Sequence, residues 1–116
     1  MNYLIVGLGG VLGANLRYLM TTLFIDESVF PIDTFIINTM GAFLFGLLFH
    51  YFHQRKSSRL ALMIKTGILS SFTTFSTFSI EVVQLFDGQF KIAIVYILSS
   101  IICSLAAFIC GMKVMR

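Results

Sequence analysis

Charged residues are scarce in this chain, and their scarcity limits what kind of protein it can be. Only 11% of the 116 residues are charged, eight basic and five acidic, whereas a soluble domain usually carries about 25%. Hydrophobic residues make up 58% of the sequence, and there is a single proline. Water is therefore not the expected solvent of this chain, and a separate soluble domain is excluded. No nucleic-acid partner is expected.

Signals of enzymatic chemistry are also missing. The sequence has no nucleophile accompanied by a base, no cluster of metal-binding side chains and no phosphate-binding loop. A G-x-G-x-x-G pattern starts at Gly7, but Leu12 stands where its last glycine is required. Gly9 and Gly13 instead form a small-xxx-small pair, which favours close contact between helices. We predict that the protein is not an enzyme.

Long apolar stretches are what the chain does have. Polar or turn-forming residues separate four of them, which cover about residues 2–24, 34–53, 60–86 and 90–112. A helix needs about 20 apolar residues to cross the hydrocarbon core of a bilayer. We therefore predict an all-α membrane protein with four transmembrane helices, forming a single membrane domain over residues 1–116. The first stretch lacks a basic leader and a convincing cleavage site, so it is expected to remain in the mature protein.

The positions of lysine and arginine predict the orientation of these helices. With four crossings, both termini share a side with the middle loop, and that side collects Arg55, Lys56, Arg59, Lys113 and Arg116. The opposite side carries Lys91 alone. Short cytoplasmic loops are enriched in basic residues. We therefore expect a multi-pass protein of the cell membrane with both termini in the cytoplasm.

The third stretch contains a run of hydroxyl residues between Ser70 and Ser79. Serine and threonine compete for backbone carbonyls and lower the helical preference, so this helix is expected to break near its middle. Carbonyls freed in a membrane survive only inside protein or beside a cavity, where they commonly bind cations. If the helix continues, Thr77 and Glu81 share one face, and Phe75 and Phe78 lie beside it. Ordinary packing and a conduction pathway both explain these two rings.

Other polar residues lie inside the predicted membrane helices. Arg17 would cost about 2.5–3.5 kcal/mol at the bilayer centre, so it either reaches an interface or carbonyl, or lends positive potential to an anion path. Asn38 either bridges two helices or donates hydrogen bonds to an anion. Tyr96, Ser100 and Ser104 are spaced four residues apart and share one helix face. That face is either a seam between helices or a hydrated path.

Three segments together resemble the Fluc/CrcB family of fluoride ion channels. They are GGVLGANLRY at 9–18, NTMGAF at 38–43 and TTFSTFSIE at 73–81, of which the last is the most specific. The resemblance implies a fluoride-selective channel that lets fluoride leave the cell passively and so lowers cytoplasmic fluoride. It also implies an antiparallel, dual-topology dimer that encloses two narrow pores. Fluoride is small and tightly hydrated, so such a pore must replace its water with several donors.

The resemblance implies roles for individual residues as well. The implied fluoride pathway consists of an amide, two phenylalanines that present their ring edges and five hydroxyl residues: Asn38, Phe75, Phe78, Ser76, Thr77, Tyr96, Ser100 and Ser104. Arg17 and Glu81 match the charged positions of the family. A structural sodium ion at the centre of the dimer is implied at the backbone carbonyls of Ser70 and Thr73. The family usually has two glycines where this chain has Ser70 and Ser71, and serine is unfavourable if the break needs a positive φ.

The charge distribution also bears on the partner subunit. A chain that pairs with a copy of itself in the opposite orientation needs little orientation bias, but here five basic residues stand against one. We therefore expect that the antiparallel partner is a homologous subunit whose basic residues favour the opposite orientation in the membrane. Two alternatives are a small four-helix, proton-coupled exporter of cations or drugs, which would need an acid deep in the membrane, and a non-conducting partner subunit of a heterodimeric channel.

Overall fold

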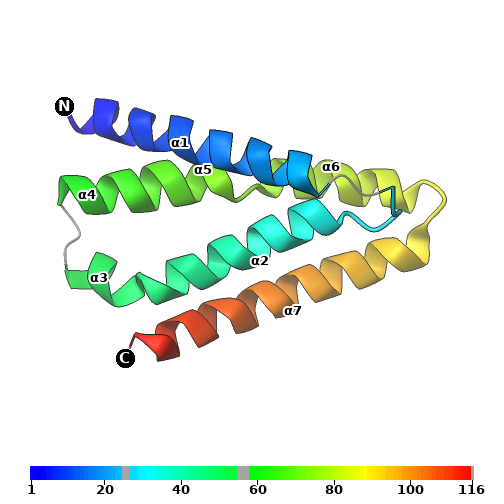
Figure 1. Ribbon diagram of the computed structural model, residues 1–116. Coiled ribbons are helices and arrows are strands. Elements are labelled where there is room, and N and C mark those ends of the chain that lie inside the picture. Colours follow the sequence, from blue (N-terminus) through cyan, green and yellow to red (C-terminus); the bar gives the residue numbers. More distant parts are fainter. Residues whose placement is uncertain (25–26, 55–57, 116) are drawn as a thin grey trace.

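Helices make up all the regular structure in the residues that the computed structural model describes, which are 1–24, 27–54 and 58–115 (Figure 1). In chain order they are α1 (Asn2–Leu23), α2 (Ile32–Leu47), α3 (Phe49–Gln54), α4 (Arg59–Leu62), the π-helix η1 (Met63–Leu69), α5 (Ser70–Phe72), α6 (Phe75–Phe86) and α7 (Phe90–Val114). The prediction of an all-α chain is confirmed.

In the second and third apolar stretches, the helix boundaries of the structure differ from the predicted ones. One helix was expected over residues 34–53, but α2 ends at Leu47, and Leu48, with φ −91° and ψ 4°, separates it from α3. The stretch 60–86 is divided into α4, η1, α5 and α6. The first and fourth stretches are continuous helices, α1 and α7. The irregular backbone therefore lies in the third stretch, at the π-helix η1 and in the hydroxyl-rich segment that follows it, and at one end of the second stretch.

The helices lie side by side along the long axis of the molecule (Figure 1). The start of α1, the end of α7, α3 and α4 lie at one end, and the start of α2, the end of α6 and the start of α7 lie at the other. Helices α2 and α7 run in the same direction and contact each other along their length, while α1 covers η1 and α5. This arrangement brings α2, α7 and the α5–α6 junction together.

Glycines allow the closest approaches between these helices. Gly9 of α1 faces Gly67 of η1 so closely that a Cβ atom on Gly67 would lie 2.7 Å from the Gly9 Cα. A Cβ atom on Gly13 would meet the carbonyl oxygen of Ile68. Real Cβ atoms do not tolerate backbone atoms this near, so only glycine permits the contact. The close-packing interpretation of Gly9 and Gly13 is confirmed.

Substitution of Gly67 by alanine is expected to destabilise the fold. The added methyl group would force α1 away from η1, and overpacking of this kind costs about 1–3 kcal/mol. Gly7 supplies a matched control, because it lies on the same helix pair but a Cβ atom there would meet nothing within 4 Å. Thermal unfolding in detergent should show a lower midpoint for Gly67→Ala and no loss for Gly7→Ala. Equal midpoints for the two variants would contradict the close contact.

The outer faces of the long helices are apolar. Helices α1 and α7 are long and apolar enough to cross a membrane, and α2 is apolar but shorter. Only 11% of the apolar window in α1 and 17% of that in α7 is buried within the chain. A core helix of a soluble protein would be mostly buried. These exposed apolar faces therefore suit contact with lipid or with a second subunit.

Candidate functional site

The break in the third stretch falls at Thr73 and Thr74. Both residues have extended backbone angles, φ −75° and ψ 154° for Thr73 and φ −142° and ψ 121° for Thr74. The Thr74 hydroxyl caps α6 by accepting a hydrogen bond from the Thr77 N–H at 3.1 Å. Threonine suits this position because its side chain can satisfy an amide at the start of a helix. The break therefore lies immediately before Phe75.

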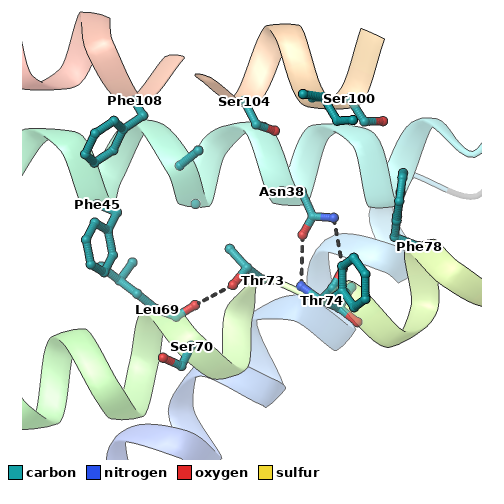
Figure 2. Close-up of a pocket in the computed structure, with 14 residues that line it drawn as sticks. Asn38, Phe45, Leu69, Ser70, Thr73, Thr74, Phe78, Ser100, Ser104 and Phe108 are labelled. Carbon is teal, nitrogen blue, oxygen red and sulfur yellow. Dashed lines mark hydrogen bonds between the residues drawn. The ribbon is translucent and has the colours of Figure 1, made fainter. Parts of the chain in front are cut away.

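Asn38 of α2 holds the broken backbone from across the helix interface (Figure 2). The backbone N–H of Thr74 donates to Asn38 Oδ1 at 2.8 Å, and Asn38 Nδ2 donates to the Thr74 carbonyl at 3.0 Å. The side-chain amide thus pairs with Thr74 as another peptide group would. An asparagine NH₂ has two hydrogens, so one of them can still donate elsewhere. Asn38 does bridge helices, and this role leaves it a donor for an anion.

Two of the backbone carbonyls beside the break have lost their helical hydrogen-bond donors to side chains. In a continuous helix the Ser70 carbonyl would accept from the Thr74 N–H, and the Thr73 carbonyl would accept from the Thr77 N–H. Here those two N–H groups donate to Asn38 Oδ1 and to the Thr74 hydroxyl. Ser70 and Thr73 are the two residues whose carbonyls were predicted to face a cation. Neither carbonyl has the donor that a continuous helix would give it.

Serine in place of glycine does not obstruct this break. Ser70 is helical, with φ −67° and ψ −31°, and Ser71 lies within α5. Among the described residues, no amino acid other than glycine has a positive φ. The chain turns two residues further on, at Thr73 and Thr74, through extended angles that any residue adopts. The concern about a positive φ therefore does not apply to this structure.

A groove of about 500 Å³ lies beside the break, between α2, α7 and the α5–α6 junction (Figure 2). Most of the predicted site residues line it: Asn38, Ser70, Thr73, Phe75, Phe78, Ser100 and Ser104. Phe45 and Phe108 line its apolar end and were missed. Their spacing could have identified them, because Phe45 follows Asn38 by two helical turns and Phe108 follows Ser100 by about two. The groove thus has a polar part near the break and an aromatic end.

Ser100 lines the groove, and its hydroxyl is buried. The residue is 8% exposed, and its Oγ has no hydrogen-bond partner within the described part of the chain. The hydroxyl of Thr39 on α2 is in the same situation. Leaving a buried polar group unpaired costs about 1–3 kcal/mol. Ser100 is thus a groove-lining residue with an unused hydrogen-bond donor in the described part of the chain.

Phe75 and Phe78 stand in different surroundings. The Phe75 side chain is 81% exposed, and its ring centroid lies 6.1 Å from that of Phe78. Phe78 is half-buried and contacts the ring of Tyr96, with centroids 5.1 Å apart. Phe75 therefore contributes little to the core of its own chain, whereas Phe78 forms part of the groove wall.

Tyr96 does not line the groove, although it was predicted to form one path with Ser100 and Ser104. It is fully buried behind Phe78, and its hydroxyl donates to Glu81 Oε2 at 2.7 Å. The hydroxyl of Thr34 donates to Glu81 Oε1 at 2.7 Å. Thr34 was missed, but it lies one helical turn before Asn38 on the same face of α2. These three residues form a hydrogen-bonded set that joins α2, α6 and α7.

The remaining predicted residues lie outside the groove. Ser76 and Thr77 are exposed at the start of α6, with their hydroxyl oxygens 3.3 and 3.0 Å from that of Thr74. Arg17 is half-buried on α1, where it forms no ion pair with any part of the chain that the structure describes. The groove therefore brings together the amide, the two phenylalanines and two of the five hydroxyls predicted for the pathway.

Comparison with known proteins places the chain in a family. Residues 4–112 match the family described as CrcB-like protein, Camphor Resistance (CrcB). The fluoride-specific ion channel FluC of Oceanobacillus iheyensis is 40% identical over 115 residues, which cover 97% of this chain and 89% of the relative. The fluoride-specific ion channel FluC 2 of Staphylococcus saprophyticus is 45% identical over 119 residues, covering 97% and 95%. FluC 1 of Ligilactobacillus salivarius is 44% identical over 109 residues, covering 91% and 92%. The resemblance found in the three sequence segments is confirmed, and the chain belongs to the CrcB family.

Proposed function

We propose that this chain is a subunit of a fluoride-specific ion channel in the cell membrane, through which fluoride leaves the cell passively. The relatives that share most of its length carry that name. The observation that carries the proposal is the groove beside the break, in which Asn38, Ser100 and Phe78 face one space. The family is one of channels and not of enzymes, which agrees with the absence of catalytic motifs from the sequence.

The groove offers what a dehydrated fluoride ion needs. The second N–H of the Asn38 amide and the hydroxyls of Ser100 and Ser104 can donate hydrogen bonds in place of water. The edges of Phe75 and Phe78 carry the positive part of the ring quadrupole and attract an anion weakly. A small, strongly basic halide gains more from close donors than chloride does, so a narrow passage of this kind favours fluoride. No further energy source enters this mechanism, and flow follows the fluoride gradient.

A second, antiparallel subunit completes the pathway. Side chains of Asn15, Ser70, Ser76 and Thr77 are exposed on the chain, beside the exposed ring of Phe75. Polar groups in the hydrocarbon region normally face protein or a water-filled cavity and not acyl chains. The face formed by α1, α5 and α6 therefore suits a protein partner, and two such faces enclose two pores.

Four crossings and cytoplasmic termini fit the layout of the helices. The broken path from α4 to α6 runs the length of the molecule as the third crossing, alongside α1, α2 and α7 (Figure 1). Arg59 begins α4 and Lys113 lies in the last turn of α7, and these two helix ends lie at the same end of the molecule as the start of α1. Lys91 lies in the first turn of α7, which is at the other end. Arg55, Lys56 and Arg116 lie outside the described residues. The predicted single membrane domain over residues 1–116 agrees with a family match that spans nearly all of it.

A structural sodium ion fits the released carbonyls of Ser70 and Thr73. Hard cations prefer oxygen ligands, and both carbonyls have lost their helical donors to side chains. The described residues contain no group of histidine, cysteine and acidic side chains that would suit a transition metal instead. The ion would hold the two broken helices of a dimer together and would take no part in selecting the anion.

Efflux from proteoliposomes tests the channel function. Liposomes loaded with fluoride or with chloride and containing the purified chain together with a homologous subunit of opposite orientation bias should release fluoride rapidly on addition of a potassium ionophore, and chloride about as slowly as protein-free liposomes. An ion-selective electrode measures both. Equal release of the two anions, or a requirement for an opposing proton gradient, would contradict the proposal, and the second result would favour a proton-coupled exporter.

Two further arms of this measurement test the partner and the sodium ion. Because of the orientation bias, the chain alone should release little fluoride, and addition of a homologous subunit of opposite bias should restore release. Full efflux by the chain alone would exclude an obligatory heterodimer. Absence of efflux in every combination would favour the alternative that this chain is a non-conducting subunit. In sodium-free medium, efflux and thermal stability should both fall if the carbonyls of Ser70 and Thr73 hold sodium.

A further inference from the structure

We propose that Phe45 and Phe108 form an apolar constriction that limits the rate at which fluoride passes the aromatic end of the groove. The inference rests on the proposed channel function and adds to it a rate-determining element made of two rings. Three observations support it: the place of the rings in the groove, the scarcity of hydrogen-bond donors beside them, and the contacts that hold them there.

Phe108 stands where the hydroxyl-bearing face of α7 would have its next residue. Ser100 and Ser104 line the groove four residues apart, and Phe108 lines it four residues further on. Residues at this spacing share one face of a helix. The row of hydroxyls on α7 therefore ends at Ser104, and a ring follows one helical turn later.

Phe45 lines the same end of the groove from α2 (Figure 2). Its ring centroid lies 6.2 Å from that of Phe108, with the ring planes inclined by 40°. Leu69 adds a third apolar side chain there. The hydroxyl of the adjacent Ser70 donates its one proton to the Lys65 carbonyl at 3.1 Å, so it has none left for an anion. Among the described side chains at this end of the groove, none offers an ion a free hydrogen-bond donor.

Two rings of α3 support the constriction from behind. The Phe49 ring meets the Phe108 ring edge-on, with centroids 5.9 Å apart and planes at 87°. The Phe52 ring lies 5.8 Å from that of Phe45, and Phe52 is itself 5% exposed. The interruption between α2 and α3 thus has a consequence for the groove, because α3 packs two further rings against the pair that lines it.

The backbones of α2 and α7 also meet at this level. Gly46 follows Phe45 directly, and a Cβ atom on Gly46 would meet the carbonyl oxygen of Phe108. Such close packing fixes the distance between the helices. Channels use hydrophobic constrictions as gates, because water leaves a narrow apolar passage readily. Fluoride holds its water tightly, so it should cross this passage more slowly than one lined by donors.

Two substitutions of Phe108 test the constriction. Phe108→Ser adds a third hydroxyl to the face of α7, whereas Phe108→Leu removes the ring but keeps the site apolar. Fluoride and chloride efflux are measured from liposomes that contain the variant chain together with the homologous subunit of opposite orientation bias. We expect Phe108→Ser to raise fluoride efflux about fivefold, because a donor replaces part of the apolar passage. Phe108→Leu should stay within about twofold of the wild type, because its passage remains apolar.

Thermal unfolding of the same preparations separates conduction from packing. Both substitutions remove the ring contacts of Phe108 with Phe45 and Phe49, so both should lower the thermal midpoint, but only Phe108→Ser should speed fluoride. Phe43→Ser is the matched control, because Phe43 is a half-buried phenylalanine of α2 that does not line the groove. Its efflux should equal that of the wild type. If Phe108→Ser fails to assemble, Phe45→Ser carries the same expectation from the facing helix.

Several outcomes would overturn the constriction while leaving the channel function intact. Wild-type efflux by Phe108→Ser would mean that the ring does not limit passage, and equal changes in Phe108→Ser and Phe108→Leu would mean that only packing was altered. Slower efflux in both would show that the rings assist the ion and do not resist it. Chloride efflux that rises with fluoride would indicate a nonselective leak. A wild-type chain that moves no fluoride with its partner would overturn the proposed function and this inference together.

Discussion

Replacement of Phe75 by isoleucine is expected to reduce fluoride efflux by about a hundredfold while leaving the fold of the chain unchanged. The Phe75 ring is 81% exposed, and in the described part of the chain its one aromatic neighbour is the ring of Phe78, so its loss removes little buried area. In the assembled channel, however, isoleucine has no polarised edge to present to a dehydrated anion. A hundredfold decrease in rate corresponds to an increase of about 2.7 kcal/mol in the free-energy barrier to fluoride passage. Electrode-monitored efflux and thermal unfolding of the same preparation check both halves of the expectation.

Phe90 provides a matched control for this substitution. It is also an exposed phenylalanine, 61% accessible, and its ring lies 5.5 Å from that of Phe86. It stands at the start of α7, outside the groove. Phe90→Ile should therefore conduct fluoride as the wild type does. If Phe75→Ile conducts equally well, the exposed ring is only a surface for the partner, and Phe75 has no role in the pathway.

Substitution of Asn38 by alanine is expected to reduce efflux by at least about a hundredfold and, unlike Phe75→Ile, to lower stability as well. Alanine removes the two hydrogen bonds to Thr74, at 2.8 and 3.0 Å, and the donor left for an anion. Leaving the amide and carbonyl of Thr74 unpaired in a buried site costs about 1–3 kcal/mol for each group. The N–H of Thr74 would then be free to return to the Ser70 carbonyl, which would move the break. Efflux and the thermal midpoint are measured together.

Ser79→Ala is the control for loss of a side-chain hydrogen bond in the same region. The Ser79 hydroxyl donates to the Phe75 carbonyl within its own helix at 2.9 Å, so its removal breaks no contact between helices. We expect efflux within about twofold of the wild type, since surface changes of this kind cost little. If Asn38→Ala retains both normal efflux and normal stability, the amide has neither of the roles assigned to it.

The pairing of Asn38 with Thr74 also connects the two proposed ion sites. The amide that would donate to fluoride is the group that draws the Thr74 N–H away from the Ser70 carbonyl. The same side chain therefore shapes the anion path and exposes a carbonyl to the proposed sodium ion. This shared dependence explains in physical terms why a channel for an anion would contain a cation in its structure.

Local features of the sequence were sufficient for the class of protein and for the approximate location of the site. Scarce charge and four long apolar stretches predicted a helical membrane chain, because burial in lipid depends on composition and helical period more than on detailed contacts. The hydroxyl run predicted a broken helix for a similar reason, since the competition between side chain and backbone acts within a few residues. The same run carries the segment that places the chain in its family.

Only the tertiary structure decided where the break falls and what each polar group does. The break is fixed by Asn38, which is 36 residues away from Thr74 along the chain, and Glu81 is held by Thr34 at a separation of 47 residues. Helical spacing predicted that Tyr96 shares one helix face with Ser100 and Ser104. In the structure its ring packs against Phe78, and its hydroxyl donates to Glu81 outside the groove. Hydrogen bonds between distant segments depend on how α2, α6 and α7 pack, which is a property of the whole fold. The composition of the chain and the spacing of residues along one helix do not determine this packing.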